Sequence, residues 1–139
     1  MGASLDPNLV VREFIQSTAA SAYAAVSGKV YAHAIPQGNM GLPAISFDIQ
    51  SGKSEPHAPI YDPLILVLRV WAPRGQGAEA RRIYNLLRDG IHGRSRVTTT
   101  TGHIIYCNEN QPGQDLTDFD TEIASVLSYW SIGMYATAT

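Results

Sequence analysis

The chain has 139 residues, a length typical of one domain, so residues 1–139 are expected to fold as a single unit. Charged residues make up only 16% of the chain, below the roughly 25% usual in globular proteins, and the formal net charge is -2. This balance argues against a protein that coats nucleic acid, because such binding needs a clear basic excess. Only Lys29 and Lys53 are lysines, so eight of the ten basic residues are arginines, which protein interfaces favour. Sparse charge with this arginine bias predicts a surface that associates with other protein chains.

The chain has one cysteine, Cys107, so no internal disulfide is possible, which suits a reducing compartment. No stretch approaches the roughly 18 apolar residues of a membrane span. The first ten residues lack the basic start and apolar run of a signal peptide. We therefore expect a protein made in the cytoplasm, without a membrane partner.

The first predicted element is a helix that begins at Pro7 and ends at Gly28. Asp6 followed by Pro7 is a typical helix start, because the carboxylate caps free N–H groups and proline fits the first helical position. Apolar residues then recur at helical spacing, and Gly28 suits the residue that follows a helix. The small residues at 18–25 would let another element approach closely.

Three strands are predicted next, at residues 30–32, 44–50 and 64–72, with a loop at 51–59. The segment 64–72 carries the strongest strand pattern. Its even-numbered residues are all apolar up to Val70 and predict a core face. The other face includes Arg69 and Trp71 and is expected to meet another layer or another chain. The turn that contains Arg74 ends the strand.

A second helix is predicted at residues 76–91, followed by a hairpin of two strands at 97–101 and 103–107. A polar loop is expected at 108–117, and a long last strand at 121–136. The resulting order is α-β-β-β-α-β-β-β. It predicts an α+β fold with an antiparallel or mixed β-sheet and two α-helices packed on one face.

The search for chemistry gives no catalytic residue, no metal site and no cofactor. The four histidines and Cys107 contain no C-x-x-C or H-E-x-x-H spacing. The segment 51–54 has the Lys and Ser of a phosphate loop but lacks its spaced glycines. A flexible connection is therefore the favoured interpretation of that segment.

An acidic run follows the polar loop, and a basic set lies on and after the second helix. The acids are Asp115, Asp118, Asp120 and Glu122, and the basic residues are Arg81, Arg82, Arg88, Arg94 and Arg96. A solvated acidic patch is favoured over a cation site, since the spacing fits no EF-hand. A subsidiary hypothesis pairs this run with the arginines of a neighbouring copy.

Trp71 and Trp130 fit the protein core, which is the favoured interpretation, or an anchor in an interface, where aromatic residues are enriched. The complete candidate assembly interface consists of Arg69, Trp71, Arg74, Arg81, Arg82, Arg88, Asp115, Asp118, Asp120 and Trp130.

Several segments, in order, resemble the tail terminator, or tail completion, proteins of long-tailed bacteriophages. They are GKVY at 28–31, IPQG at 35–38, LPAI at 42–45, LVLRVWA at 66–72, LLRDGIHG at 86–93 and the closing strand at 123–135. The resemblance spans nearly the whole chain. The polar insertion at 51–59 departs from the family, and the role of that loop stays open.

The resemblance implies a virion protein without enzymatic activity. Such proteins form a ring, usually a hexamer, that caps the tail tube, stops its polymerisation and offers a surface to the head connector, while DNA passes through the lumen. The expected partners are other copies of the chain, the tail tube protein and the head–tail connector. Loops 52–59 and 108–117 are the predicted docking segments. Another phage connector or tube protein is an alternative, and a small-molecule-binding or enzymatic α+β domain is a more remote one.

Overall fold

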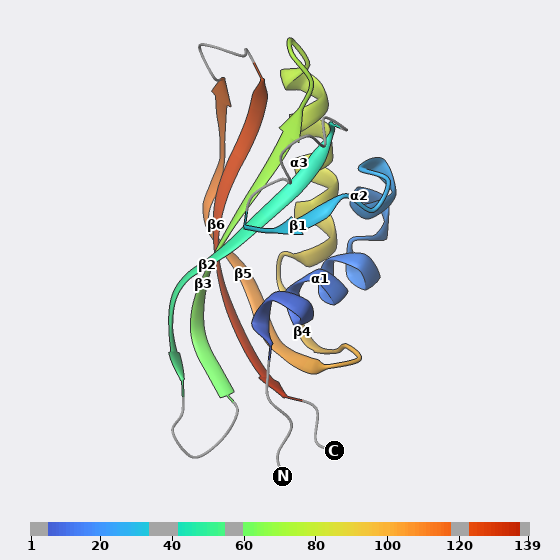
Figure 1. Cartoon of the computed structure of the whole chain (residues 1–139). Helices are drawn as coiled ribbons and strands as arrows, with labels where there is room; N and C mark the ends of the chain where they lie inside the picture. The colour runs from blue at the N-terminus through green and yellow to red at the C-terminus, as the bar shows by residue number, and fades with distance from the viewer. Residues whose placement is uncertain (1–5, 34–41, 55–59, 118–122, 137–139) are drawn as a thin grey trace.

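The computed structural model describes residues 6–33, 42–54, 60–117 and 123–136 (Figure 1). Its helices are α1 (Pro7–Thr18), α2 (Ala20–Ala25) and α3 (Gly77–Ile91). Its strands are β1 (Val30–Ala32), β2 (Ala44–Ser54), β3 (Ile60–Ala72), β4 (Arg94–Thr98), β5 (Gly102–Thr117) and β6 (Ala124–Ala136).

The six strands form one sheet in the order β1-β2-β3-β6-β5-β4. Strand β1 runs parallel to β2, and every other neighbouring pair is antiparallel, so the sheet is mixed. The three helices lie on one side of this curved sheet (Figure 1). The predicted α+β class, with helices on one face of a mixed sheet, is confirmed, although the described residues form three helices rather than two.

The core lies between the helices and the side of the sheet that they cover. Alternate residues of β3 point into it and are almost fully buried, in the order Leu64, Leu66, Leu68, Val70 and Ala72. Helix α3 presents a complete buried stripe to the sheet, made of Ala80, Ile83, Tyr84, Leu87 and Ile91. Full burial of a side chain as large as leucine stabilises the fold by roughly 1.5–3 kcal/mol. The apolar spacing of the sequence therefore sets which face of each element is covered.

The prediction of one continuous first helix is wrong, because the helix breaks at Ala19. Thr18 donates its hydroxyl to the carbonyl of Phe14, a local bond that competes with the regular backbone pattern. The break coincides with a close approach of α3. A Cβ atom placed on Gly90 would lie 2.7 Å from the Cα atom of Ala19. The small residues at 18–25 thus allow the expected close contact with another element, here α3. The chain also changes direction between α1 and α2.

The predicted polar loop at 108–117 is also wrong, because these residues form the second half of β5 and pair with β6 to Thr117. The pairing contains register shifts between Glu109 and Gln111 and between Gln111 and Gln114. Such bulges admit Pro112 where a regular central strand would not. Likewise, β2 continues to Ser54 into the predicted loop, whose residues 55–59 lie outside the described part of the chain.

Candidate assembly surface

The side of the sheet opposite the helices carries a mixed apolar and polar surface, which we call the open face. Pairing across the strands places Ser46, Arg69 and Leu127 in one row, and Asp48, Val67 and Tyr129 in the next. A third row contains Trp71 and Ser125. The central side chains of these rows on β3 and β6 are half-buried by their neighbours in the sheet. The expectation that Arg69 and Trp71 share the non-core face of their strand is confirmed.

A hollow of about 250 Å³ lies on the open face and is lined by residues of β2, β3 and β6 together with His33. The guanidinium carbon of Arg69 lies 4.7 Å from the centre of the Trp71 ring, within the range of a cation–π contact. The Trp71 indole donates to the Ser46 hydroxyl at 2.9 Å and is thereby held in place. At the rim, His33 and Asp48 are joined at 2.9 Å.

Arg69 has an unsatisfied hydrogen-bond donor in this hollow. Its Nε atom is buried and has no hydrogen-bond partner among the residues that the structure describes. A buried donor without an acceptor costs about 1–3 kcal/mol. The Arg69 side chain thus lies in a hollow whose lining also includes the apolar side chains of Val67 and Leu127.

The three arginines of α3 pair with acids of their own chain. Arg81 contacts Asp115 at 2.9 Å and donates to the carbonyl of Gly113. Arg82 pairs with Glu79, one helical turn away, at 2.6 Å. Arg88 pairs with Glu109 at 3.1 Å, and the side chain of Glu109 is only 5% exposed.

Arg81 already binds Asp115, the first acid of the predicted run, within its own chain. This contact weakens the hypothesis that these arginines pair with acids of a neighbouring copy. Asp118 and Asp120 lie outside the described residues. Arg74 is exposed in the turn between β3 and α3 and takes part in an interaction of its own.

Trp130 lies in the core and is fully buried, which confirms the favoured interpretation of that residue. Its indole donates to the Ser128 hydroxyl at 2.8 Å, and its ring meets His92 edge-on at 6.0 Å. It has no accessible surface in this chain, so its inclusion in the assembly interface is wrong for the folded subunit.

Tyr84 of α3, and His92 directly after it, accept hydrogen bonds from the second half of β5, which sequence reasoning missed. The backbone N–H of Glu109 donates to the ring of His92 at 3.0 Å. The backbone N–H of Gly113 donates to the hydroxyl of Tyr84 at 2.9 Å, and that hydroxyl in turn donates to the Glu109 carboxylate. Burial and then the Glu109 contact raise the pKa of Tyr84 to about 12. Tyr84 and His92 thus occupy the side of β5 at which a further strand would otherwise pair.

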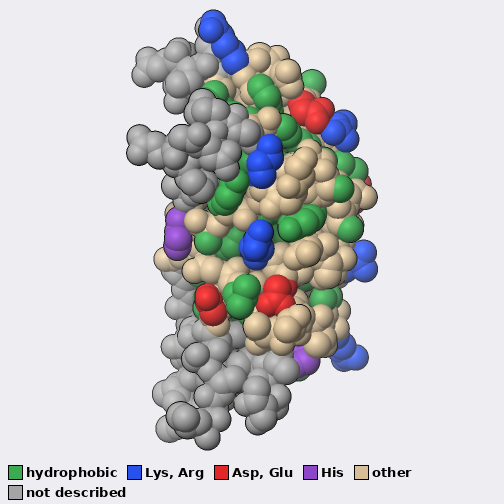
Figure 2. Space-filling model, turned by 45° about the vertical axis from the view of Figure 1, so that its right-hand side comes forward, with side chains coloured by type: hydrophobic (Ala, Val, Ile, Leu, Met, Phe, Trp, Pro, Cys, Tyr) green, Lys and Arg blue, Asp and Glu red, His purple; other side chains and the backbone are tan. Residues whose placement is uncertain are grey.

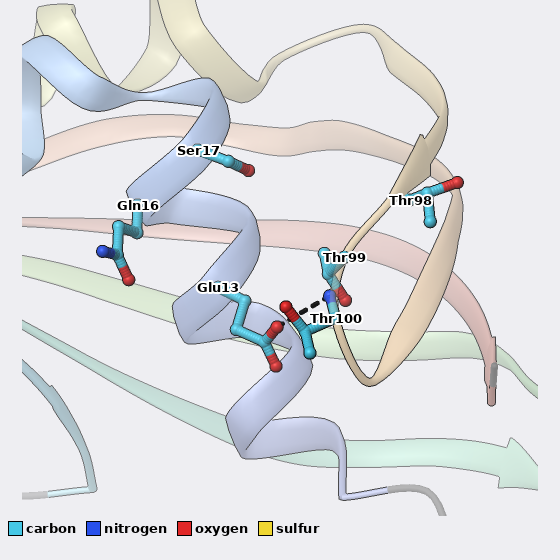
Figure 3. A pocket seen from close by; sticks show the side chains of 6 residues that line it. All are labelled: Glu13, Gln16, Ser17, Thr98, Thr99 and Thr100. Carbon is cyan, nitrogen blue, oxygen red and sulfur yellow. Dashed lines mark hydrogen bonds between the residues drawn. The ribbon is translucent and has the colours of Figure 1, made fainter.

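A second hollow, of about 630 Å³, lies between α1 and the turn from β4 to β5 (Figure 3). The Glu13 carboxylate accepts from the backbone N–H of Thr100 at 2.8 Å and from the hydroxyl of Thr101 at 2.6 Å. Partial burial acts to raise the pKa of Glu13, but these hydrogen bonds together lower it below its usual value. Among the described residues of the lining, Glu13 is the only ionisable one, and its hydrogen bonds fix the turn.

Within the described ranges, no group of three or more His, Cys, Asp or Glu residues could hold a metal ion. Cys107 is buried, and burial raises the pKa of its thiol to about 12, so the nucleophilic thiolate is scarce at neutral pH. Over the same ranges, every helix is too short or too polar to cross a membrane.

Comparison with known proteins identifies a shared fold among solved structures. No family model matches the chain, and no curated protein matches it. Among solved structures, it is similar to a chain of the structure described as "Virion of native gene transfer agent (GTA) particle". The TM-score is 0.64 and the sequence identity is 14%, and the match covers 90% of this chain and 91% of the other. The two chains therefore share their fold over nearly their whole lengths.

Proposed function

We propose that this chain is a structural protein of a phage-like virion, without enzymatic activity. The observation that carries the proposal is the fold shared over 90% of the chain with a chain of a gene transfer agent virion. The open face adds support, because a half-apolar sheet surface with an unsatisfied arginine is suited to contact with another protein.

Within such a virion, the role that we propose is that of the tail terminator. The chain would form a ring, a hexamer, that caps the tail tube, stops its polymerisation and joins the tail to the head connector. The order of segments that resembles this family supports the role. The net charge of -2 is compatible with a lumen through which DNA slides without sticking.

Electron microscopy and solution mass of the purified protein test this role. Short closed rings are expected, as is arrest of tube growth when the protein is added to the tail tube protein of the same particle. Open-ended tubes made by this protein alone would instead identify a tube protein. A chain that stays monomeric in the presence of tube protein would overturn the proposal.

The open face is the proposed subunit contact, and paired variants of two arginines test it. Arg69→Met removes the unsatisfied donor while keeping a long apolar stem, so we expect fewer rings at a given protein concentration. Arg82→Met is the matched control, because Arg82 is exposed and bound to Glu79 of its own helix. Equal ring yields for the two variants would show that the open face is not the subunit contact.

A further inference from the structure

Strand β2 is longer than the strand that covers its outer edge. β2 has 11 residues, whereas β1 has three and pairs only with residues 45–47 of β2. The N–H of His33, directly after β1, donates to the carbonyl of Phe47 at 2.7 Å. Beyond that bond, at residues 48–54, no strand in the described part of the chain pairs with the outer edge of β2.

The other edge of the sheet is open at the same end of the molecule. β4 is the last strand, and four of its five residues are exposed. Pairing through β3, β6 and β5 places Gly52 of β2 in one row with Arg94 of β4. It likewise places Ser54 in one row with Val97. Over these rows, β2 and β4 are the two borders of a sheet of five strands.

The chain covers both edges in its other half. β1 pairs with β2 there, and Tyr84 and His92 accept hydrogen bonds from the backbone of β5 beyond the end of β4. Open edges pair readily with strands of other chains, so proteins block the edges that are not used in this way. The contrast between the covered and the open halves favours a role in pairing for the open ones.

Thr98 and Ile49 direct backbone groups outward at these two edges. Along a paired strand, successive residues direct their N–H and C=O groups to alternate sides. The N–H of Thr99 donates to the carbonyl of Gly102, so the N–H of Thr98 points away from β5. In β2, the carbonyl of Phe47 is bonded on the β1 side, so the N–H of Ile49 faces that side too. The described residues supply no acceptor for either N–H beyond these edges.

The direction of the two strands decides which pairing a ring permits. Each neighbouring pair from β2 to β4 is antiparallel, so β2, β6 and β4 all run the same way. Copies related by rotation in a ring keep one orientation relative to the ring axis. β4 of one copy and β2 of the next would therefore be parallel, as β1 and β2 are within one chain.

We propose that β4 of one copy pairs in parallel with the open part of β2 in the next copy. This inference rests on the proposed ring and names its backbone contact. A second copy is favoured over a foreign strand, because one chain supplies both open edges, with the same direction and in the same rows. The contact borders the open face, since His33 and Asp48 at the β2 edge line the hollow there. A contact between two different edges closes into a ring when the rotation between copies allows it.

Amide hydrogen exchange of the wild-type chain tests this pairing without any substitution. The outward N–H groups of Thr98 and Ile49 should exchange at least about tenfold more slowly in rings than in the dilute monomer, because pairing protects them from water. The N–H of Val97 is the internal control. By the same alternation it faces β5, so it should be protected in both states.

A proline at the β4 edge tests the same contact by mutation. Thr98→Pro removes the outward N–H and leaves the pairing with β5 intact, since proline is tolerated where the N–H of an edge strand faces away from the sheet. We expect the association between subunits to weaken about tenfold or more. Thr98→Val is the matched control, because it keeps the N–H and loses only the hydroxyl, which contacts His103. Light scattering over a dilution series measures both, and melting of the dilute monomers checks that both variants fold.

The outcomes are distinct. Rings in which both amides exchange as fast as in the monomer would overturn edge pairing and leave the proposed ring in place. Protection of Thr98 without protection of Ile49 would also overturn it, and would identify antiparallel pairing of two β4 strands in a dimer. Equal association of the proline and valine variants would count against β4 in the same way. A wild-type chain that forms no rings would overturn the proposed function itself.

Discussion

Trp130 and Trp71 lie on neighbouring strands of one sheet but on opposite faces, and their surroundings differ. Trp130 has no exposed surface, and both it and its hydrogen-bond partner Ser128 are buried in the core. Trp71 is half-buried, and it lies beside an arginine whose buried Nε atom has no partner in the described chain. Trp130 thus has its hydrogen-bond partner within the core, whereas Trp71 lies on a face that is partly exposed in the single chain.

Figure 2 shows that the surface over the helices carries basic and acidic side chains spread among polar and apolar ones. On α3, the arginines are matched by acids of the same chain. The covered face thus contains most of the buried apolar side chains, and the open face is the surface that we propose for association.

The largest difference in the free energy of unfolding between the two faces is expected from substitution of the two tryptophans. Trp130→Ala should lower the free energy of unfolding by about 3–5 kcal/mol, because it opens a cavity in the core. Trp71→Ala, its matched control, should cost about 1 kcal/mol, mainly through the lost bond to Ser46. Urea unfolding measures both values, and equal losses would break the distinction between the faces.

The next effect concerns the contact between helices on the covered face. Gly90→Ala should destabilise the fold by about 1–3 kcal/mol, because the added Cβ would lie 2.7 Å from the Ala19 backbone. Gly77→Ala is the control, since its Cβ would meet only Ala124 at an ordinary 3.8 Å. Thermal melts that show the same change for both variants would contradict the close approach of α3.

A smaller effect is expected where α3 completes the edge of β5. Tyr84→Phe should cost about 1–2 kcal/mol, because it leaves Glu109 and the N–H of Gly113 without the hydroxyl. The pKa of Tyr84 is raised, so the folded state holds this proton more tightly than the unfolded state. Wild-type stability should therefore fall as pH rises from about 10 to about 12, and Tyr84→Phe should flatten this fall. A profile that is unchanged in the variant would rule out this link.

The smallest effect is expected at Glu13, whose contact with the β4–β5 turn is near the surface. Glu13→Gln should cost less than about 1 kcal/mol, since exposed charged contacts are weak. Its pKa is lowered in the folded chain, so the contribution is present above the usual carboxylate range and is lost as pH falls through the folded value. Acid unfolding curves that coincide for wild type and variant would show that the contact adds nothing.

The sequence predicts the covered face well, because buried positions recur at regular intervals of apolar residues along each element. The alternation in β3 and the stripe of α3 both follow from apolar spacing, and both are observed. In β6, buried apolar side chains likewise alternate along the strand, with Ala124, Val126, Trp130, Ile132 and Met134 on the core side.

The failures arise where partners from distant segments decide the structure. Residues 108–117 carry polar side chains together with Pro112 and Gly113, which is typical of a loop. They form a strand because β6 pairs with it on one side. On the other side, His92 and Tyr84 accept from its backbone and Arg81 donates to it. The break at Ala19 similarly coincides with the close approach of Gly90, which lies 71 positions later in the chain. The pairing of Arg81 with Asp115 has no signal in local spacing either.

The sequence predicts a sheet face that could contact another chain, but it identifies only some of the residues on that face. Arg69 and Trp71 follow from strand alternation, because a charged residue among apolar ones marks the face away from the core. The unsatisfied Nε atom and the hollow around it depend on three strands and require coordinates. Residue type alone makes Trp130 a candidate interface anchor, whereas the favoured interpretation, a core position, is the one observed.

Cys107 gives this protein a built-in chemical reporter. The thiol is the only one in the chain, it is buried under the covered face, and its raised pKa keeps it protonated. An alkylating reagent should therefore react with it only when β5 separates from its neighbours. The labelling rate would measure how often the sheet opens, in a free subunit or in an assembled particle, without any engineered probe. The same shielding would preserve the reduced thiol in a particle exposed to air.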